Sequence, residues 1–189
     1  MSVLKIIQYG HPLLSQEAEE VRSLGPKELT LIEDMIETMY AADGIGLAAT
    51  QVGVMQRIFV VDAHRNRDDN TPRNPLVFVN PVVIKESNDD VTYEEGCLSI
   101  PKLNAEVWRP EIITVDARDQ DFKPFEIECD GLLARVVQHE LDHLDGILFI
   151  DRLGDEEREA VAVKLRKIRD NAMKSMPPEN QVYPMIDHA

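Results

Sequence analysis

Apolar residues recur at helical spacing in three segments of the chain, and this pattern predicts three helices. The first helix begins near Pro26, which suits a first turn, and ends near Asp43. The second covers residues 131–146 and is closed by Gly146, a residue type that often ends helices. The third covers residues 155–176, with acidic residues at its start and basic residues at its end, as the helix dipole favours.

Apolar and β-branched runs typical of strands lie between the first and second helices. They predict four strands, over residues 56–63, 76–84, 111–119 and 125–130. Because strands and helices do not alternate as regular β-α-β units, the pattern predicts an α+β fold. With 189 residues and no internal repeat, we expect one domain over residues 1–176, followed by an irregular C-terminal tail over 177–189.

The composition is that of a globular protein with a strong acidic bias. Hydrophobic residues make up 43%, charged residues 29%, and the net charge is −15. This charge argues against a protein whose main task is binding nucleic acid or an anionic membrane surface, because both need a positive patch. No apolar run approaches the roughly 20 residues that span a bilayer. The two cysteines, Cys97 and Cys129, are too few for a disulfide framework, so we expect a reducing, cytoplasmic compartment.

The most informative motif is "HELDH" (residues 139–143), which has the pattern H-E-x-x-H. On a helix, His139 and His143 lie about 40° and about 6 Å apart, so both imidazoles can reach one divalent ion. Glu140 points about 100° away from His139 and can take a proton from a metal-bound water. The alternative is a helix that carries two histidines at this spacing without a metal. The apolar residues before the motif predict a buried helix, and buried imidazoles need partners, which favours the metal.

A catalytic metal usually has a third protein ligand, and its identity separates the classes of enzyme. A metzincin protease would have a histidine where this chain has Phe149, which excludes that class. A thermolysin-like protease would use a glutamate from the next helix, with candidates in residues 156–159. Cys97 in "EEGCLSIP" is the third candidate, because a thiolate binds iron or zinc well. Spacing alone does not bring Cys97 to His139, so the residues leave this choice open.

The stretch "GIGLAATQVG" (residues 44–53) contains the G-x-G-x-x-A pattern of dinucleotide-binding loops. That pattern functions after a strand and at the start of a helix. Here a predicted helix precedes the glycines and the βαβ frame is missing, which argues against a nucleotide-binding module. A non-catalytic binding protein is a further alternative, but the glutamate beside the two histidines would then have no function.

Three separated segments, "GIGLAATQVG", "EEGCLSIP" and "QHELDHLDG", resemble the three signature motifs of the peptide deformylases, in the family's order. The resemblance extends to the intervening strands and the final helix. It implies a single catalytic domain in which antiparallel sheets surround a central helix that carries the histidines. It also implies a hydrolase that removes the N-formyl group from the formylmethionine of nascent proteins and releases formate.

The resemblance further implies a role for individual residues. The implied metal ligands are Cys97, His139 and His143. The implied metal is Fe²⁺, with Zn²⁺ or Ni²⁺ as replacements. Glu140 would act as general base and then as general acid while metal-bound water attacks the formyl carbon, and the side chain of Gln51 and the backbone N–H of Leu98 would stabilise the oxyanion. Gly46 would bring the backbone close to the substrate. The residues implied to shape or support the methionine pocket are Ile45, Glu95, Leu98 and Val136.

The predicted C-terminal helix is basic within an acidic chain. Its cationic residues are Lys164, Arg166, Lys167, Arg169 and Lys174. They form either a solvated face that complements the helix dipole or, as the resemblance implies, a transient contact with the ribosome near the exit of the nascent chain. The expected partners are therefore formylmethionyl peptides and nascent chains, with no direct nucleic-acid function and no membrane.

Overall fold

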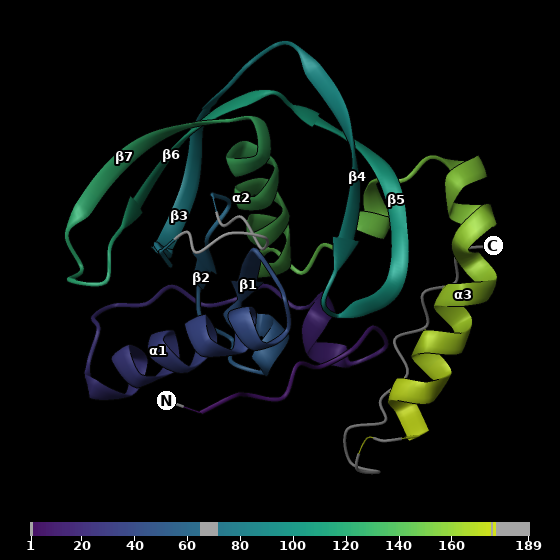
Figure 1. Cartoon of the computed structure of the whole chain (residues 1–189), viewed down its shortest axis with the longest axis horizontal. Helices are drawn as coiled ribbons and strands as arrows, with labels where there is room; N and C mark the ends of the chain where they lie inside the picture. The colour runs from purple at the N-terminus through teal and green to yellow at the C-terminus, as the bar shows by residue number, and fades with distance from the viewer. Residues whose placement is uncertain (1, 65–71, 175, 177–189) are drawn as a thin grey trace.

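The computed structural model describes residues 2–64, 72–174 and 176, in which three α-helices, three short 3-10 helices and seven strands occur (Figure 1). The α-helices are α1 (Pro26–Ala41), α2 (Gly131–Leu144) and α3 (Asp155–Lys174). The 3-10 helices are η1 (Pro12–Ser15), η2 (Ala49–Val52) and η3 (Phe149–Arg152). The strands are β1 (Gly46–Ala48), β2 (Ile58–Val61), β3 (Leu76–Glu86), β4 (Asp90–Cys97), β5 (Ile100–Pro110), β6 (Ile112–Arg118) and β7 (Pro124–Asp130).

The main sheet has five strands in the order β1-β2-β3-β6-β7, and each neighbouring pair is antiparallel. Side chains alternate between the two faces of a strand, and both faces of β2 are covered. Phe59 and Val61 pack in one core cluster with apolar residues of α2, whereas Ile58 and Val60 pack in another with apolar residues of α1. The two helices therefore cover opposite faces of this sheet.

The strands β4 and β5 form a separate antiparallel hairpin. Its register pairs Gly96 with Asn104 and then shifts to pair Cys97 with Ile100. The shift skips residues 101–103 of β5 and no residue of β4, and such an irregularity bends a strand and redirects its side chains. It lies immediately beside the cysteine of the second sequence motif. The apolar residues of β5 join those of η3 and α3 in a third core cluster.

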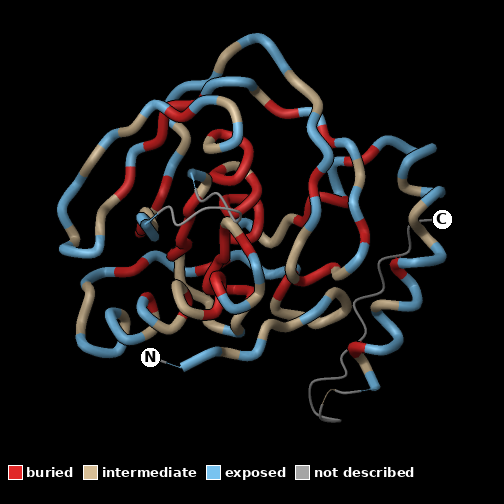
Figure 2. The backbone as a smooth tube through the Cα atoms, in the orientation of Figure 1, coloured by how far each residue is buried: buried red, intermediate tan, exposed pale blue. Residues whose placement is uncertain are grey.

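The helix α2 occupies the centre of the molecule, between the main sheet and the hairpin (Figure 1). Figure 2 shows that α2 is buried along most of its length, whereas α3 at the edge of the molecule is mostly exposed. Polar side chains on α2 therefore lie away from water, where each needs a partner. Within the described ranges, no helix is both long and apolar enough to cross a membrane.

The structure confirms the α+β fold, the three helices and the four predicted strands, with helix ends displaced by about two residues. The sequence reading missed β1, β4 and β5. The hairpin is rich in charged residues, and one of the buried positions on β5 is Arg109, so the expected alternation of apolar and polar letters is broken. The predicted boundary between domain and tail remains a prediction, because residues 177–189 lie outside the described residues.

Candidate active site

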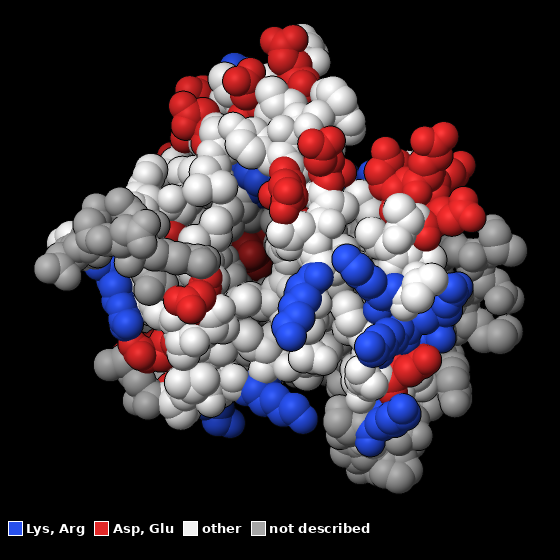
Figure 3. All heavy atoms as spheres, turned by 45° about the vertical axis from the view of Figure 1, so that its right-hand side comes forward, with Lys and Arg blue, Asp and Glu red and all other residues white. Residues whose placement is uncertain are grey.

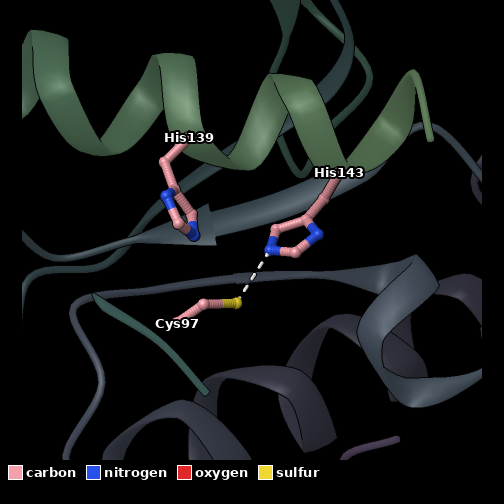
Figure 4. Close-up of side chains that lie close together, drawn as sticks. All are labelled: Cys97, His139 and His143. Carbon is pink, nitrogen blue, oxygen red and sulfur yellow. Dashed lines mark hydrogen bonds between the residues drawn. The ribbon is translucent and has the colours of Figure 1, made fainter. Parts of the chain in front are cut away.

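The three side chains proposed as metal ligands lie together. His139 and His143 project from successive turns of α2, and Cys97 stands at the end of β4 (Figure 4). Their ligand atoms all lie within 4.8 Å of one another, and Cys97 Sγ is 3.2 Å from His143 Nε2. One thiolate and two imidazoles are a donor set that zinc and iron accept, and it leaves a coordination position open. The residues present therefore fit a catalytic divalent metal.

The geometry also distinguishes between the alternative third ligands. Among the described residues, the cluster with Cys97 is the one set of three potential ligands that comes this close together. The glutamates of residues 156–159 lie at the exposed start of α3 and do not take part. Phe149, in the position of the metzincin histidine, is buried and packs with its ring 6.1 Å from that of His139. Cys97 follows the register shift of the hairpin and lies close to the histidines, which spacing could not show.

Glu140 lies beside the cluster and is 3% exposed. In the described part of the chain, two buried side-chain atoms lack a hydrogen-bond partner, Glu140 Oε2 and His143 Nδ1, and both belong to this site. Burial raises the pKa of the Glu140 carboxyl to about 7. A β-carbon on Gly46 would lie 2.3 Å from Glu140 Oε1, so this glycine makes room for the carboxylate. The sequence had connected Gly46 only with the substrate.

Gln51 on η2 is buried, and its amide is held in one orientation. Its Oε1 accepts a hydrogen bond from the backbone N–H of Ala48 at 2.8 Å. Its Nε2 donates to Ser99 Oγ at 3.2 Å and lies 3.5 Å from Cys97 Sγ. Since the oxygen is engaged by a backbone donor, the N–H groups face the ligand cluster. A donor is therefore preorganised beside the position where a metal would bind.

These residues line a cavity of ≈ 530 Å³, within the roughly 300–1,000 Å³ usual for ligand pockets. Figure 3 shows the hollow, with acidic side-chain atoms at its floor. Every proposed site residue lines it except His143, which lies deeper, at 1% exposure. Its apolar walls include Ile45, Leu98, Leu132 and Val136. The cavity therefore combines an apolar pocket with the candidate metal centre.

The sequence model of the family described as polypeptide deformylase matches residues 3–159 of this chain. The chain belongs to this family. A peptide deformylase from Agrobacterium fabrum is 46% identical over 167 residues, which cover 88% of this chain and 96% of the relative. One from Pelagibacter ubique is 45% identical over 171 residues, covering 90% and 98%. The crystal structure of a peptide deformylase from Legionella pneumophila superposes with a TM-score of 0.80 at 38% identity, covering 93% and 100%. The matches confirm the family, the enzyme class and the fold that the three motifs implied.

Glu95 lines the cavity and also contacts His139, one of the three clustered side chains. Its Oε2 lies 2.9 Å from His139 Nδ1. Burial alone would raise the pKa of Glu95, but hydrogen bonds from His139 and Arg109 lower it well below its usual value. An ionised carboxylate only accepts hydrogen bonds, so His139 Nδ1 is the donor and Nε2 remains for the metal.

Sequence reasoning missed the buried ion network that surrounds Glu95 in the deformylase. Arg109, at 2% exposure, donates to Glu95 Oε1 and to Asp142 Oδ2, both at 2.7 Å. Arg135 donates to the same Glu95 oxygen at 2.8 Å, and Arg152 donates to Asp142 at 2.6 Å. The network joins β4, β5, α2 and η3. Of the residues that join Glu95 in this network, only Asp142 carried a sequence signal, because it lies inside the histidine motif.

Proposed function

We propose that this chain hydrolyses the N-formyl group of N-formylmethionyl peptides and nascent chains at the cavity described above, releasing formate. One observation carries the proposal: a buried carboxylate with an unpartnered oxygen, Glu140 Oε2, lies beside three converging metal ligands at the floor of a peptide-sized hollow. A carboxylate in that place can move a proton between water and a leaving group.

A divalent metal held by Cys97, His139 and His143 would act as a Lewis acid and lower the pKa of water. Glu140 takes one proton from the water whose oxygen attacks the formyl carbon. As the carbon–nitrogen bond breaks, Glu140 gives this proton to the leaving amine nitrogen, and formate and a free amino terminus result. Gln51 Nε2 and the backbone N–H of Leu98 donate to the oxygen on which negative charge develops, and one such donor is typically worth about 10²–10³ in rate.

The cavity walls suit a methionine side chain. Ile45, Leu98 and Val136 present apolar surface beside the ligand cluster. A thioether side chain is flexible and apolar, so it fills irregular apolar space well. Glu95 supports this wall from behind through its contacts with Arg135 and Arg109. The formyl group of a peptide whose methionine lies in this pocket would reach the floor.

We also propose Fe²⁺ as the native metal, with Zn²⁺ or Ni²⁺ as replacements, on the strength of the three-motif resemblance. Two imidazoles and a thiolate accept each of these ions. Elemental analysis of anaerobically purified protein identifies the bound metal. Iron in near-equal amount with protein supports the proposal, and anaerobically purified protein that contains zinc or nickel but no iron contradicts the choice of iron.

Formate release from formyl-Met-Ala tests the proposed function directly. We expect formate from the purified chain, loss of the activity in excess chelator, and recovery when a divalent ion is returned, because the metal supplies the Lewis acid. Acetyl-Met-Ala is the matched control, and no free amino terminus should be released from it. Full turnover by protein shown to be free of metal would overturn the proposal.

The ribosome contact of α3 remains a proposal with a test of its own. Figure 3 shows basic side chains gathered along this edge of the molecule, below the acidic start of the helix. Reversing Lys164, Lys167 and Lys174 to Glu is expected to reduce co-sedimentation with ribosomes several-fold at low salt, because phosphate contacts depend on positive charge. Unchanged co-sedimentation would contradict the ribosome contact and would favour the alternative, in which the basic residues form a solvated face of α3.

A further inference from the structure

A second cavity lies between α3 and the N-terminal segment, on the side of the hairpin away from the main sheet. Its volume is ≈ 220 Å³, and it shares no lining residue with the catalytic cavity. Three parts of the chain line it: residues 9–15, residues 148–151 around η3, and one face of α3. Nothing in the proposed hydrolysis uses these residues.

Close contact at Gly10 holds one wall of this cavity in place. Gly10 has a φ of +102°, and a β-carbon there would lie 2.7 Å from Arg169 Cγ and 3.2 Å from Arg169 Cα. The helix α3 therefore rests directly on the backbone of the N-terminal segment, which only glycine permits. Leu165, on the same face of α3, is buried in the core cluster that includes Leu14 and Leu148. The cavity is thus part of the packed fold.

Charge along the rim of this cavity is opposite to that of the whole protein. Arg158, Arg166 and Arg169 line it from one face of α3, against a single lining carboxylate, Asp151. The net charge of the chain is −15. Such a local excess of positive charge in an acidic protein favours an anionic ligand.

The three arginines differ in the partners that they already have. Arg158 donates to the carbonyl oxygens of Asp151 and Leu153. In the part of the chain that the structure describes, the one side-chain partner of Arg169 is its neighbour Asp170, at 3.3 Å on the surface. Within the described residues, Arg166 has no hydrogen-bond or ion-pair partner, and it lines the cavity. The guanidinium of Arg166 is therefore free to bind an anion, with Arg169 beside it.

The floor of the cavity is apolar. The lining residues there are Leu14, Leu148, Ile150 and Leu165, each no more than 7% exposed. Ala162 supplies a small side chain where a larger one would fill the space. A bare inorganic anion would leave this surface uncovered, whereas an aliphatic chain would cover it. The volume is below the roughly 300–1,000 Å³ of pockets for drug-sized ligands, so the ligand is small.

We propose that this cavity binds a short aliphatic carboxylate, with its chain on the leucine and isoleucine floor and its carboxylate on Arg166 and Arg169. Planar guanidinium groups bind carboxylates through paired hydrogen bonds, which favours this head group. The same chemistry is offered by a free short-chain fatty acid and by the C-terminal carboxylate of a peptide that ends in an aliphatic residue. The site does not depend on the proposed hydrolysis.

Titration of the metal-loaded full chain, followed by amide NMR, tests this site. Hexanoate represents the free acid, N-acetyl-leucine represents the peptide terminus, and hexanol and inorganic phosphate are the controls. We expect shifts confined to residues 9–15, residues 148–151 and α3 with one or both carboxylates, and much weaker binding of the controls. The tighter of the two carboxylates identifies the source of the ligand, and either one supports the proposal.

Variants on α3 make the assignment specific. Arg166→Gln is expected to weaken carboxylate binding about tenfold, because a hydrogen bond to a charged group is lost. Lys167→Gln, the matched control on an exposed neighbour outside the cavity, should change nothing. Ala162→Phe should abolish binding by filling the cavity. Formate release should be unaffected by Arg166→Gln, which separates this proposal from the proposed hydrolysis.

Several results would overturn the carboxylate site. Absence of binding by both carboxylates would do so, as would equal binding of hexanol. Affinity that survives both Arg166→Gln and Ala162→Phe would place the ligand elsewhere. Shifts at Gly46 and Leu98 in place of residues 9–15 would assign it to the catalytic cavity.

Discussion

Replacing Glu140 with Gln is expected to lower kcat for formyl-Met-Ala by about 10²–10⁴-fold, the usual range for loss of a general base and acid. The amide keeps the shape of the side chain beside Gly46 but cannot carry the proton from water to the leaving amine. Cys97, His139 and His143 are untouched, so the metal content should remain that of the unmodified protein. Formate release and elemental analysis of the same sample measure the two quantities together.

The matched control for this variant is Glu94→Gln. Glu94 also lines the catalytic cavity, but it is exposed and accepts a hydrogen bond from Asn104 at 2.7 Å. Removing its charge should leave turnover close to that of the unmodified chain. If Glu140→Gln retained similar turnover with its metal in place, the assignment of Glu140 as the proton carrier would be wrong.

Arg109→Met is expected to lower the free energy of unfolding by about 3–5 kcal/mol, because it leaves two buried carboxylates short of a partner. Glu95 and Asp142 both accept from this guanidinium and are themselves buried. The loss should also make the orientation of the His139 ring less fixed, because His139 Nδ1 donates to Glu95. Urea unfolding gives the free energy, and metal affinity reports the effect on the ligand.

Lys123→Met is the control for a surface charge. Lys123 pairs with Asp121 at 2.9 Å where both side chains are exposed, so no measurable change in unfolding is expected. The double variant Arg109→Met with Asp142→Asn should lose less than the sum of the single variants, because the two residues share one interaction. Additive losses would contradict a shared interaction between the two residues. An Arg109→Met protein as stable as the unmodified chain would contradict a stabilising role for the network.

The deformylase motifs show which parts of the site local sequence patterns can predict. The spacing of "HELDH" places two imidazoles on one helical face, and the structure confirms this arrangement on α2. Cys97 could be joined to them only by resemblance, because it lies 42 positions before His139 in the sequence. The β4–β5 hairpin makes the connection in space, because Cys97 at the end of β4 lies close to α2. The charged sequence of that hairpin concealed its strands.

The sequence by itself thus predicted the helices, most of the strands, the histidine pair, the glutamate and the family. These depend on periodicity and on spacing over a few residues, which backbone geometry converts directly into direction. The tertiary structure alone showed that Cys97 lies close to the two histidines, that Arg109 joins Glu95 to Asp142, and that α3 encloses an arginine-lined cavity. Such contacts join residues far apart in the sequence, and they form only when a buried charge or an apolar face finds its partner in the folded chain.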